Sequence, residues 1–183
     1  MKKLFNAVLI LFSLSLFASS QTFENDTAFQ VAFSPQGECQ DIIVNAINKA
    51  QKTILVQAYS FTSAPIAKAL LIAHKRNVSV KVILDRSQVT QKYSSATFLE
   101  NQKISLWIDY KPAIAHNKVM IIDDHIVITG SFNFTKAAQE KNVENVIVID
   151  SKKLAETYTK YWNERLKQSI PVKEYRQRKE PKS

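Results

Sequence analysis

The sequence predicts an α/β domain in which a mixed, mostly parallel central sheet is sandwiched by helices. Three observations lead to this prediction. Apolar runs of strand length alternate along the chain with segments whose apolar residues recur at helical spacing. The chain has 183 residues, of which 45% are hydrophobic, and this suits one domain with a sufficient core. No internal repeat and no interdomain linker is visible.

The first half of the chain predicts strands and helices in alternation. The alternating segment 27–33 predicts an edge strand, and the apolar spacing of 38–51 predicts an amphipathic helix after it. The run TILVQAYSF at 53–61 is uncharged and predicts a buried strand. A proline in the first turn and helical spacing predict a helix over 64–76. The run VSVKVIL predicts a second buried strand at 78–84.

The second half continues the pattern with shorter elements. A weaker helical pattern covers 88–100, and a short strand is expected at 104–108. Two strands, at 118–122 and 126–129, flank a turn that contains two aspartates. The run VENVIVI at 143–149 predicts a further strand.

The C-terminal part predicts one long helix and a basic tail. Apolar residues at helical spacing place the helix over 151–167. Its aromatic residues Tyr158, Tyr161 and Trp162 are expected to pack in the core or at a dimer contact rather than to stack on bases. Residues 168–183 are rich in Lys and Arg, and we expect them to form a flexible tail.

The N-terminal residues 1–20 have the pattern of a signal peptide. Lys2 and Lys3 precede an uncharged, mostly apolar run over 4–17, and small residues follow it. This run is shorter than the roughly 20 residues that span a bilayer. We therefore expect a cleaved signal that exports the domain at 21–167 to a bacterial periplasm or the medium. The alternative is a retained segment that anchors the protein in the membrane.

The composition excludes several kinds of chemistry. The two glycines, Gly37 and Gly130, lie far apart, so the common glycine-rich phosphate-binding loops are absent. One cysteine, Cys39, excludes a disulfide framework and a Cys-rich zinc site. No cofactor is therefore expected. The formal net charge of +9 favours attraction to a polyphosphate.

One segment carries a dense set of polar residues. Residues 116–133 read HNKVMIIDDHIVITGSFN. Because side chains alternate along an extended segment, His116 and Lys118 are expected to face the same side, where an imidazole beside an ammonium suits a phosphate. By the same alternation Asp123 should face away and orient the turn. The pattern H-x-K-x4-D-x6-G-S-x-N has as its fixed residues His116, Lys118, Asp123, Gly130, Ser131 and Asn133.

Two further features of the segment bear on its chemistry. Ser131 and Asn133 would offer a hydroxyl and an amide to one face, and a helix that starts near Asn133 would add backbone N–H groups for an anion. Asp123, Asp124 and His125 could bind a divalent ion. A tight turn explains these three residues better, and no metal is expected.

This pattern is similar to the signature of the phospholipase D superfamily. The stretches AYSFT at 58–62 and GSFNFTKAAQEKNVEN at 130–145 resemble the small secreted bacterial endonuclease of that superfamily, which has one motif per chain. The resemblance covers about residues 29–167. It implies a phospholipase D/nuclease-like fold and a phosphodiesterase that works without metal through a phosphohistidine intermediate.

The resemblance also implies residue roles. His116 matches the nucleophile of the family, and Glu144 matches the carboxylate that holds the imidazole. Asp123 matches the motif aspartate. The implied catalytic residues are His116, Lys118, Asp123 and Glu144, and the implied phosphate-binding residues are Lys118, Ser131 and Asn133.

The chemistry predicts a second copy of the chain as a partner. Attack on phosphorus needs a neutral imidazole and departure of an alkoxide needs a proton donor, so one His cannot serve both needs in one step. The chain has a single H-x-K, since neither His74 nor His125 has a lysine two residues on. We therefore expect a twofold homodimer with one shared site, in which His116 of another copy supplies the second imidazole.

The sequence thus predicts an exported, metal-independent endonuclease that acts on DNA with little sequence preference, and it leaves RNA open as a second substrate. One alternative is a phospholipase D that acts on phosphatidyl lipids by the same chemistry. Contact with a membrane is expected only for that substrate or for a retained signal segment. The other alternative is a basic DNA-binding or uptake protein without turnover, and the complete motif argues against it.

Overall fold

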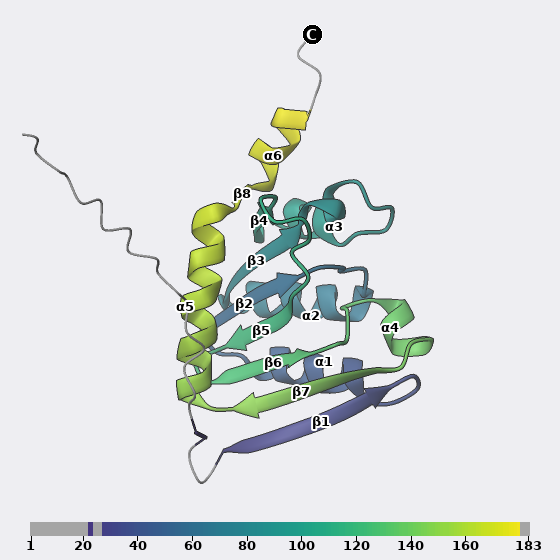
Figure 1. Ribbon diagram of the computed structural model, residues 1–183, viewed down its shortest axis with the longest axis vertical. Helices are drawn as coiled ribbons and strands as arrows, with labels where there is room; N and C mark the ends of the chain where they lie inside the picture. Colours follow the sequence, from purple (N-terminus) through teal and green to yellow (C-terminus); the bar gives the residue numbers. More distant parts are fainter. Residues whose placement is uncertain (1–21, 24–26, 180–183) are drawn as a thin grey trace, which may run out of the picture.

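The computed structural model of the chain describes residues 22–23 and 27–179. The expected signal peptide at 1–20 lies outside the described residues, as do 180–183. Within the described part, eight strands form a single sheet (Figure 1). The strands are β1 (Ala28–Ser34), β2 (Thr53–Ala58), β3 (Ser79–Asp85), β4 (Ser105–Asp109), β5 (Lys118–Ile122), β6 (Ile126–Gly130), β7 (Glu144–Asp150) and β8 (Ile170–Pro171).

Helices connect and cover the strands. The two longest begin at capping serines: the Ser63 hydroxyl accepts from the N–H of Ile66, and the Ser151 hydroxyl accepts from the N–H of Leu154. In the described ranges, no helix combines the length and the apolar character that crossing a bilayer requires. The helices are α1 (Cys39–Lys49), α2 (Ala64–Lys75), α3 (Ala96–Asn101), α4 (Lys136–Glu140), α5 (Lys152–Gln168) and α6 (Val172–Lys179), and one 3₁₀ turn is η1 (Arg86–Val89).

The sheet is mixed, with the strand order β1-β7-β6-β5-β2-β3-β4-β8. The pairs β2–β3 and β3–β4 are parallel, and the other five described pairs are antiparallel. The prediction of a mostly parallel sheet is therefore wrong, although the α/β class is confirmed. Crossovers through α2 and α3 produce the parallel pairs. In contrast, a tight turn joins β5 to β6, and the segment with the short helix α4 joins β6 to β7, so these strands run antiparallel.

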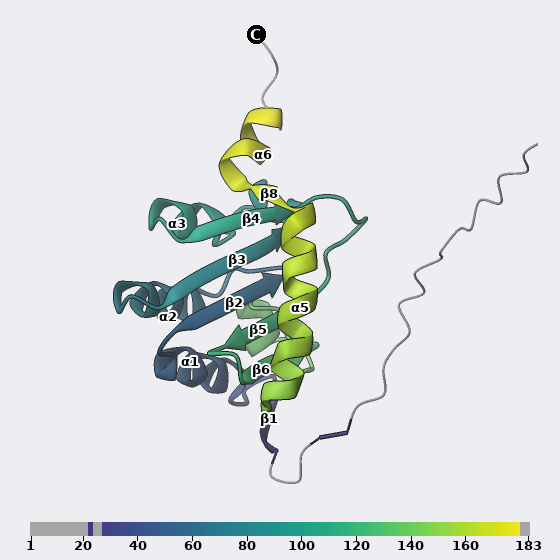
Figure 2. The same cartoon turned by 90° about the vertical axis from the view of Figure 1, so that its left-hand side faces the viewer.

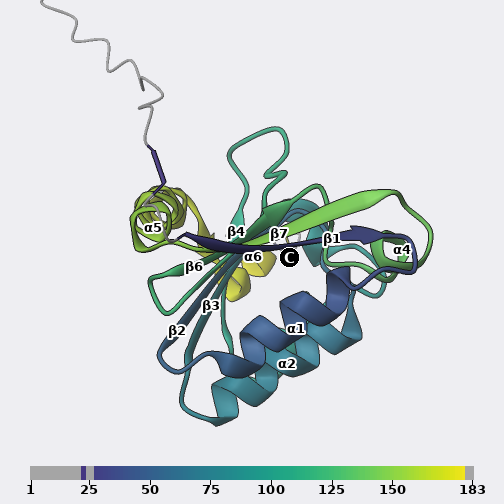
Figure 3. The same cartoon turned by 90° about the horizontal axis from the view of Figure 1, so that it is seen from below.

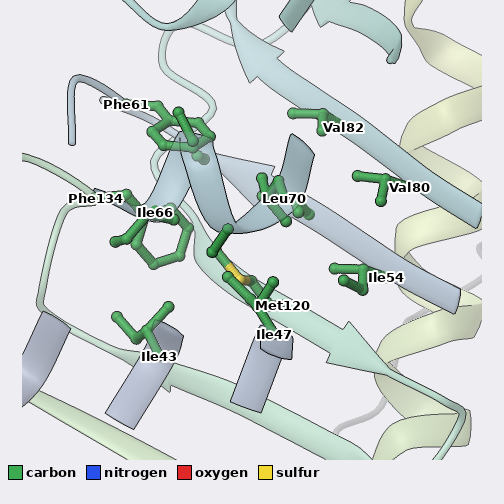
Figure 4. Close-up of a cluster of buried hydrophobic side chains, with 14 of the residues drawn as sticks. Ile43, Ile47, Ile54, Phe61, Ile66, Leu70, Val80, Val82, Met120 and Phe134 are labelled. Carbon is green, nitrogen blue, oxygen red and sulfur yellow. The ribbon is translucent and has the colours of Figure 1, made fainter. Parts of the chain in front are cut away.

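Helices cover both faces of the sheet. The pair α1 and α2 lies on one face, and α5 crosses the other (Figures 2 and 3). The larger hydrophobic core fills the space between the sheet and the α1–α2 pair. Figure 4 shows members of this core from both helices, from the central strands and from the segments after β2 and β6, namely Ile43, Ile47, Ile54, Phe61, Ile66, Leu70, Val80, Val82, Met120 and Phe134.

A second, smaller core lies between the sheet and α5. Trp162 is 1% exposed, and its indole N–H donates to the carbonyl oxygen of Val56 at 3.0 Å. Tyr158 packs against the same cluster, whereas Tyr161 is 51% exposed. The predicted packing role of the helix aromatics is thus confirmed for Trp162 and Tyr158, and Tyr161 lies on the surface.

The C-terminal segment differs from the expected flexible tail over its described part, 168–179. After α5 the chain adds β8 to the edge of the sheet beside β4 and continues into α6. Val172 and Tyr175 are buried, and Arg176 forms an ion pair of 3.3 Å with Glu100. These two apolar side chains, spaced one helical turn apart among basic residues, are what attach the segment to the domain.

The predicted helix over 88–100 is divided into η1, a loop and α3. Gln88 is buried, and its side-chain oxygen accepts from the N–H of Phe61 at 2.9 Å and from the hydroxyl of Ser94 at 3.3 Å. The N–H of Ser95 donates to the carbonyl oxygen of Phe61 at 2.8 Å. These bonds attach the loop to the segment that follows β2, which borders the candidate site.

Candidate active site

The predicted site residues gather at one edge of the sheet, with one exception. At this edge β2, β3 and β6 end while β5 and β7 begin (Figure 1). His116 precedes β5, and Lys118 is the first residue of that strand. Ser131 follows β6, and Glu144 opens β7. The antiparallel run β5–β6–β7 brings segments from both ends of the motif to this edge, and only Asp123 lies elsewhere.

His116 and Lys118 form the centre of the site. Lys118 Nζ lies 2.8 Å from Nδ1 and 3.1 Å from Nε2 of His116, and it donates to the carbonyl oxygen of His116 at 2.8 Å. Lys118 is buried, with an exposed fraction of 7%, whereas His116 is exposed. Burial lowers the pKa of the Lys118 ammonium, and the negative charge of Glu144 acts in the opposite direction. The pair thus combines an accessible imidazole with a fixed cation.

Tyr59 is a neighbour of this pair that the sequence analysis did not assign. Its ring centroid lies 4.5 Å from that of His116, and Lys118 Nζ lies 5.4 Å from the centre of the Tyr59 ring. The N–H of Tyr59 donates to the carbonyl oxygen of Asn117 at 2.9 Å. The sequence analysis placed Tyr59 inside the strand predicted at 53–61, whereas β2 ends at Ala58 and Tyr59 directly follows it at the edge where the motif residues meet.

Ser131 and Glu144 are joined by a short hydrogen bond. The Ser131 hydroxyl donates to Glu144 Oε2 at 2.6 Å, and the Asn142 amide donates to Oε1 at 3.0 Å. The N–H of Asn145 donates to the Ser131 oxygen at 3.1 Å. In the single copy that the structure describes, the Glu144 carboxylate is therefore bound to Ser131 and Asn142. Its predicted contact with the imidazole of His116 stays a prediction.

Asn133 is half-buried between two core residues. Phe132 and Phe134 are each 1% exposed, as their alternation with Ser131 and Asn133 predicted. The Asn133 Oδ1 atom is buried and has no hydrogen-bond partner among the described residues. Such an atom costs free energy unless a ligand, water or another chain completes it. The helix expected near Asn133 begins later, as the five-residue α4 capped by Thr135.

Asp123 lies at the opposite end of β5, away from His116. Its carboxylate accepts hydrogen bonds from the backbone N–H groups of Gln51, Lys52 and Thr53 at 2.7, 2.7 and 2.8 Å. Burial alone would raise the pKa of Asp123, but these three hydrogen bonds lower it below the usual carboxyl value. Asp123 therefore fixes the connection between α1 and β2 and touches neither His116 nor Lys118.

The backbone at 123–125 forms the predicted tight turn. Asp123 and Asp124 both have positive φ, at 51° and 62°. His125 Nδ1 lies 2.9 Å from a carboxylate oxygen of Asp150, and both side chains are about half exposed. Across the described residues, no group of three or more His, Cys, Asp or Glu side chains could hold a metal ion.

A groove of about 560 Å³ opens beside the pair, with Tyr59 in its wall. Ser87, Thr90 and Ile114 also line it. The guanidinium of Arg86 lies at the same groove and donates to the carbonyl oxygen of Ala113 at 3.0 Å. The wall of this groove is thus mixed, with the guanidinium of Arg86, the carboxylate of Asp85 and apolar side chains such as Ile114.

A comparison with protein families shows which family the chain belongs to. Residues 43–167 match the family described as cardiolipin synthase, PLD-like domain. The chain belongs to the phospholipase D superfamily. The match includes every residue of the motif and Glu144.

Relatives within the phospholipase D superfamily have different names. A protein of Rickettsia conorii named phospholipase D is 49% identical over 130 residues, which are 71% of this chain and 65% of the relative. The mitochondrial cardiolipin hydrolase of Xenopus laevis is 32% identical over 111 residues, which are 61% of this chain and 53% of the relative. The chain thus spans 65% of the length of the first relative and 53% of the second.

Two solved structures match this chain over almost their full length. Nuc of Salmonella typhimurium, a phospholipase D family member, has a TM-score of 0.77 and 42% identity, and the match covers 80% of this chain and 98% of Nuc. NucT of Helicobacter pylori has a TM-score of 0.72 and 25% identity, with 80% and 99% covered. The predicted phospholipase D/nuclease-like fold is confirmed.

Proposed function

We propose that this phospholipase D superfamily protein is an exported, metal-independent phosphodiesterase that cleaves nucleic acid, with DNA as its first substrate, through a phosphohistidine at His116. The observation that carries the proposal is the exposed His116 ring held against the buried ammonium of Lys118. Ser131 and Asn133 lie at the same edge and offer further groups to a phosphate. An accessible nucleophile beside a fixed cation suits attack on an anionic diester.

The reaction has two balanced steps. A neutral ring nitrogen of His116 attacks phosphorus, a P–N bond forms, and the P–O bond to the leaving alkoxide breaks as that oxygen takes a proton. Lys118, Ser131 and Asn133 then hold the charge on the non-bridging oxygens. In the second step, a water molecule gives a proton to the same group that protonated the leaving alkoxide. The water oxygen bonds to phosphorus, and the P–N bond breaks and frees His116.

The proton donor comes from a second copy of the chain. Of the other histidines, His74 lies in the last turn of α2, and His125 lies in the β5–β6 turn beside Asp150. Neither is near His116, because His125 lies at the opposite end of β5 and His74 is the eleventh residue of a helix that begins next to the site edge. A twofold homodimer would place the second His116 across one shared site.

Two lines of support favour nucleic acid over lipid. The similarity to Nuc covers 98% of that protein, whereas the stretch matched in the Rickettsia phospholipase D covers 65%. The groove beside Tyr59 offers Arg86, Ser87 and Thr90 to a phosphodiester backbone, although its wall also contains Asp85 and the apolar Val89 and Ile114. The names of the relatives keep phosphatidyl lipid as the second candidate substrate.

The test offers three substrates side by side to the purified chain, namely plasmid DNA, RNA and phosphatidylcholine vesicles, each with excess EDTA. We expect plasmid cleavage that persists in EDTA and that His116→Ala abolishes. The matched control His74→Ala should cleave like the wild type, because His74 lies on α2 away from the site. Circular dichroism spectra of both variants test whether they fold like the wild type.

Each alternative gives a different result in this test. Release of choline without DNA cleavage would replace nuclease by phospholipase. Cleavage that stops in EDTA and returns with a divalent ion would contradict the metal-free mechanism, and cleavage by His116→Ala would contradict the nucleophile. Plasmid binding without any turnover would leave a DNA-binding protein.

We also propose export through residues 1–20. The support is the charge and hydropathy pattern of this segment. Mass spectrometry of the protein from a bacterial periplasm or medium should find Gln21 as the first residue. Recovery of the uncleaved chain from the membrane fraction would indicate an anchor instead.

A further inference from the structure

A groove leads away from the reacting pair at Tyr59. The Tyr59 ring forms part of its wall, and the centroid of this ring lies 4.5 Å from that of His116. The volume of the groove, about 560 Å³, is within the range of pockets that hold small molecules. A group that is bonded to a phosphate at His116 is therefore within reach of the groove.

Hydrogen bonds from charged residues fix the shape of the groove. The Asp85 carboxylate accepts from the N–H groups of Ser87 and Ala115 at 2.9 and 2.8 Å. The Arg86 guanidinium donates to the carbonyl oxygen of Ala113 at 3.0 Å. These bonds tie the end of β3 and η1 to the loop before β5. The groove is thus preformed, which favours binding because a ligand does not have to order its walls.

Within the described chain, the two ionic side chains of the wall have opposite charges. Asp85 is 3% exposed and bonded to backbone N–H groups, and Arg86 is bonded to a backbone carbonyl oxygen. Binding of several phosphates in a row needs several unpaired cations, and the described wall offers Arg86 alone. The rest of the groove therefore suits a neutral part of the substrate.

The remaining wall combines apolar surface with hydroxyl groups. Ile114 is 55% exposed and Val89 is half-buried, and the side chains of Ser87 and Thr90 are exposed. An acyl chain would cover the hydroxyls without bonding to them, which costs free energy. A nucleobase has an apolar face and a polar edge, so it matches both kinds of group.

Part of the wall comes from α6. Tyr175 lines the groove, is 8% exposed, and lies with its ring centroid 6.2 Å from that of Tyr110. Its helix follows β8, which pairs with β4 at the edge of the sheet (Figure 1). The segment is outside the residues 43–167 that match the family model. The groove is thus completed by a part of the chain that the family match does not include, and the rings of Tyr59 and Tyr175 both border it.

We infer that the groove is a base subsite, which holds the nucleobase of a nucleotide that adjoins the scissile phosphate. The base subsite rests on the proposed function, because a nucleic-acid substrate brings a base next to the phosphate at His116. Stacking on an aromatic ring is open to every base, so the subsite strengthens binding without selecting a sequence. It acts most strongly on unpaired nucleotides, since a paired base must first leave its stack.

The experiment measures the binding of four phosphate esters to the full chain by isothermal titration calorimetry. The ligands are thymidine 5′-phosphate, thymidine 3′-phosphate, methyl phosphate and phosphorylcholine. We expect at least one thymidine phosphate to bind about tenfold more tightly than methyl phosphate, because only the nucleotides carry a base for the subsite. Methyl phosphate serves in every variant as the reference for binding of the phosphate group.

Two variants alter the subsite and leave the reacting pair unchanged. Ile114→Ala removes apolar surface, and Ser87→Leu fills space in the groove. Each should reduce the preference for thymidine phosphate over methyl phosphate at least about threefold. The matched controls Ile72→Ala and Ser79→Leu change the same residue types at exposed positions of α2 and β3 outside the groove, and they should keep the wild-type preference. Circular dichroism of every variant tests whether it folds like the wild type.

A cleavage assay then shows which neighbouring base the groove holds. The dinucleotide TpT is compared with two analogues, each of which lacks the base on one side of the phosphate. One analogue should have a KM raised at least about fivefold and a kcat changed much less, because the base contributes binding rather than chemistry. Ile114→Ala should narrow this difference in KM, whereas Ile72→Ala should keep it.

The possible results separate the base subsite from the proposed function. Equal affinity for methyl phosphate and both thymidine phosphates, or a preference that Ile114→Ala and Ser87→Leu leave unchanged, would overturn the subsite. Phosphorylcholine that binds most tightly and depends on the same two residues would overturn it in favour of a lipid headgroup. Groove-dependent binding of thymidine phosphate by a protein that cleaves no DNA would uphold the subsite and reject the phosphodiesterase. Cleavage that is equal with and without either base would reject the subsite alone.

Discussion

A charged side chain lies at each end of β5, and the surroundings of the two differ. At one end the Lys118 ammonium is buried against an imidazole and a carbonyl oxygen, with no carboxylate in hydrogen-bond contact in the described chain. At the other end the Asp123 carboxylate accepts three backbone N–H groups. Three hydrogen bonds stabilise the charged form of Asp123, whereas burial destabilises the charged form of Lys118.

Two residues of one sequence motif, Lys118 and Asp123, therefore have different properties. Burial lowers the pKa of Lys118, whereas three hydrogen bonds lower the pKa of Asp123. A partly compensated cation is available to an incoming anion, and a saturated carboxylate is not. Under the proposed function, the motif therefore joins a reactive end at His116 and Lys118 to a structural end at Asp123 through five residues of buried strand.

The largest effect is expected from removing the cation. Lys118→Met should lower the rate of phosphodiester cleavage on the order of 10³-fold, because the non-bridging oxygens lose a fixed charge in the transition state. The free energy of unfolding at pH 7 should not fall, since the buried charge is also removed. Lys81→Met on the exposed side of β3 is the control. Near-normal cleavage by Lys118→Met would show that Lys118 is not part of the reactive end.

The reverse pattern is expected at the structural end. Asp123→Ala should lower the free energy of unfolding by about 2 kcal/mol, because three N–H groups lose their acceptor, and should change cleavage per folded molecule only a few-fold. Asp124→Ala is matched for positive φ and should have the smaller effect. Urea titration and initial rates measure both quantities. A severe loss of rate in stably folded Asp123→Ala would move Asp123 into the reactive end.

The stability difference between wild type and Asp123→Ala should depend on pH. The pKa of Asp123 is lowered in the folded protein, so its contribution is fully present above the ordinary carboxyl pKa. It is lost as the pH falls through the lowered folded value. Urea midpoints for both proteins should therefore differ equally at pH 7 and about pH 5.5 and converge towards about pH 2. A difference that persists at the acid end would mean that the carboxylate is not the source.

The smallest effect is expected beside the nucleophile. Tyr59→Leu should lower the cleavage rate by about tenfold, since the ring that packs against His116 is lost, and Tyr59→Phe should restore most of it. The pH profile of the rate is the decisive readout, because a purely structural role would leave its shape unchanged. Equal rates for all three proteins would remove Tyr59 from the site.

Much of the fold could be predicted from the sequence because its elements have clear periods. The strand at 118–122 was placed at its observed bounds, and the helices at 64–76 and 151–167 were placed within one residue. Sheet direction was not predictable in this way, since uncharged runs indicate burial on both faces but not which neighbour a strand pairs with. The segment 168–179 was misjudged because the two apolar residues that attach it are few among many charges.

The site was predictable where it depends on alternation and less so where it depends on tertiary contacts. The shared side of His116 and Lys118 follows from strand parity, and the structure shows their contact. The proximity of Tyr59 comes from the antiparallel pairing of β2 with β5, and the sequence analysis predicted no strand pairing. The bond of Ser131 to Glu144 likewise depends on the pairing of β6 with β7.

The most direct test of the reactive end is to trap the intermediate. The wild-type chain is mixed with a short DNA substrate, quenched during turnover in alkaline denaturant, and digested for peptide mass spectrometry. We expect the peptide containing His116 to carry the mass of the phosphoryl-bearing fragment, with no such adduct in Lys118→Met or His116→Ala. Continued turnover with no adduct at His116, or with the adduct on another residue, would contradict the account.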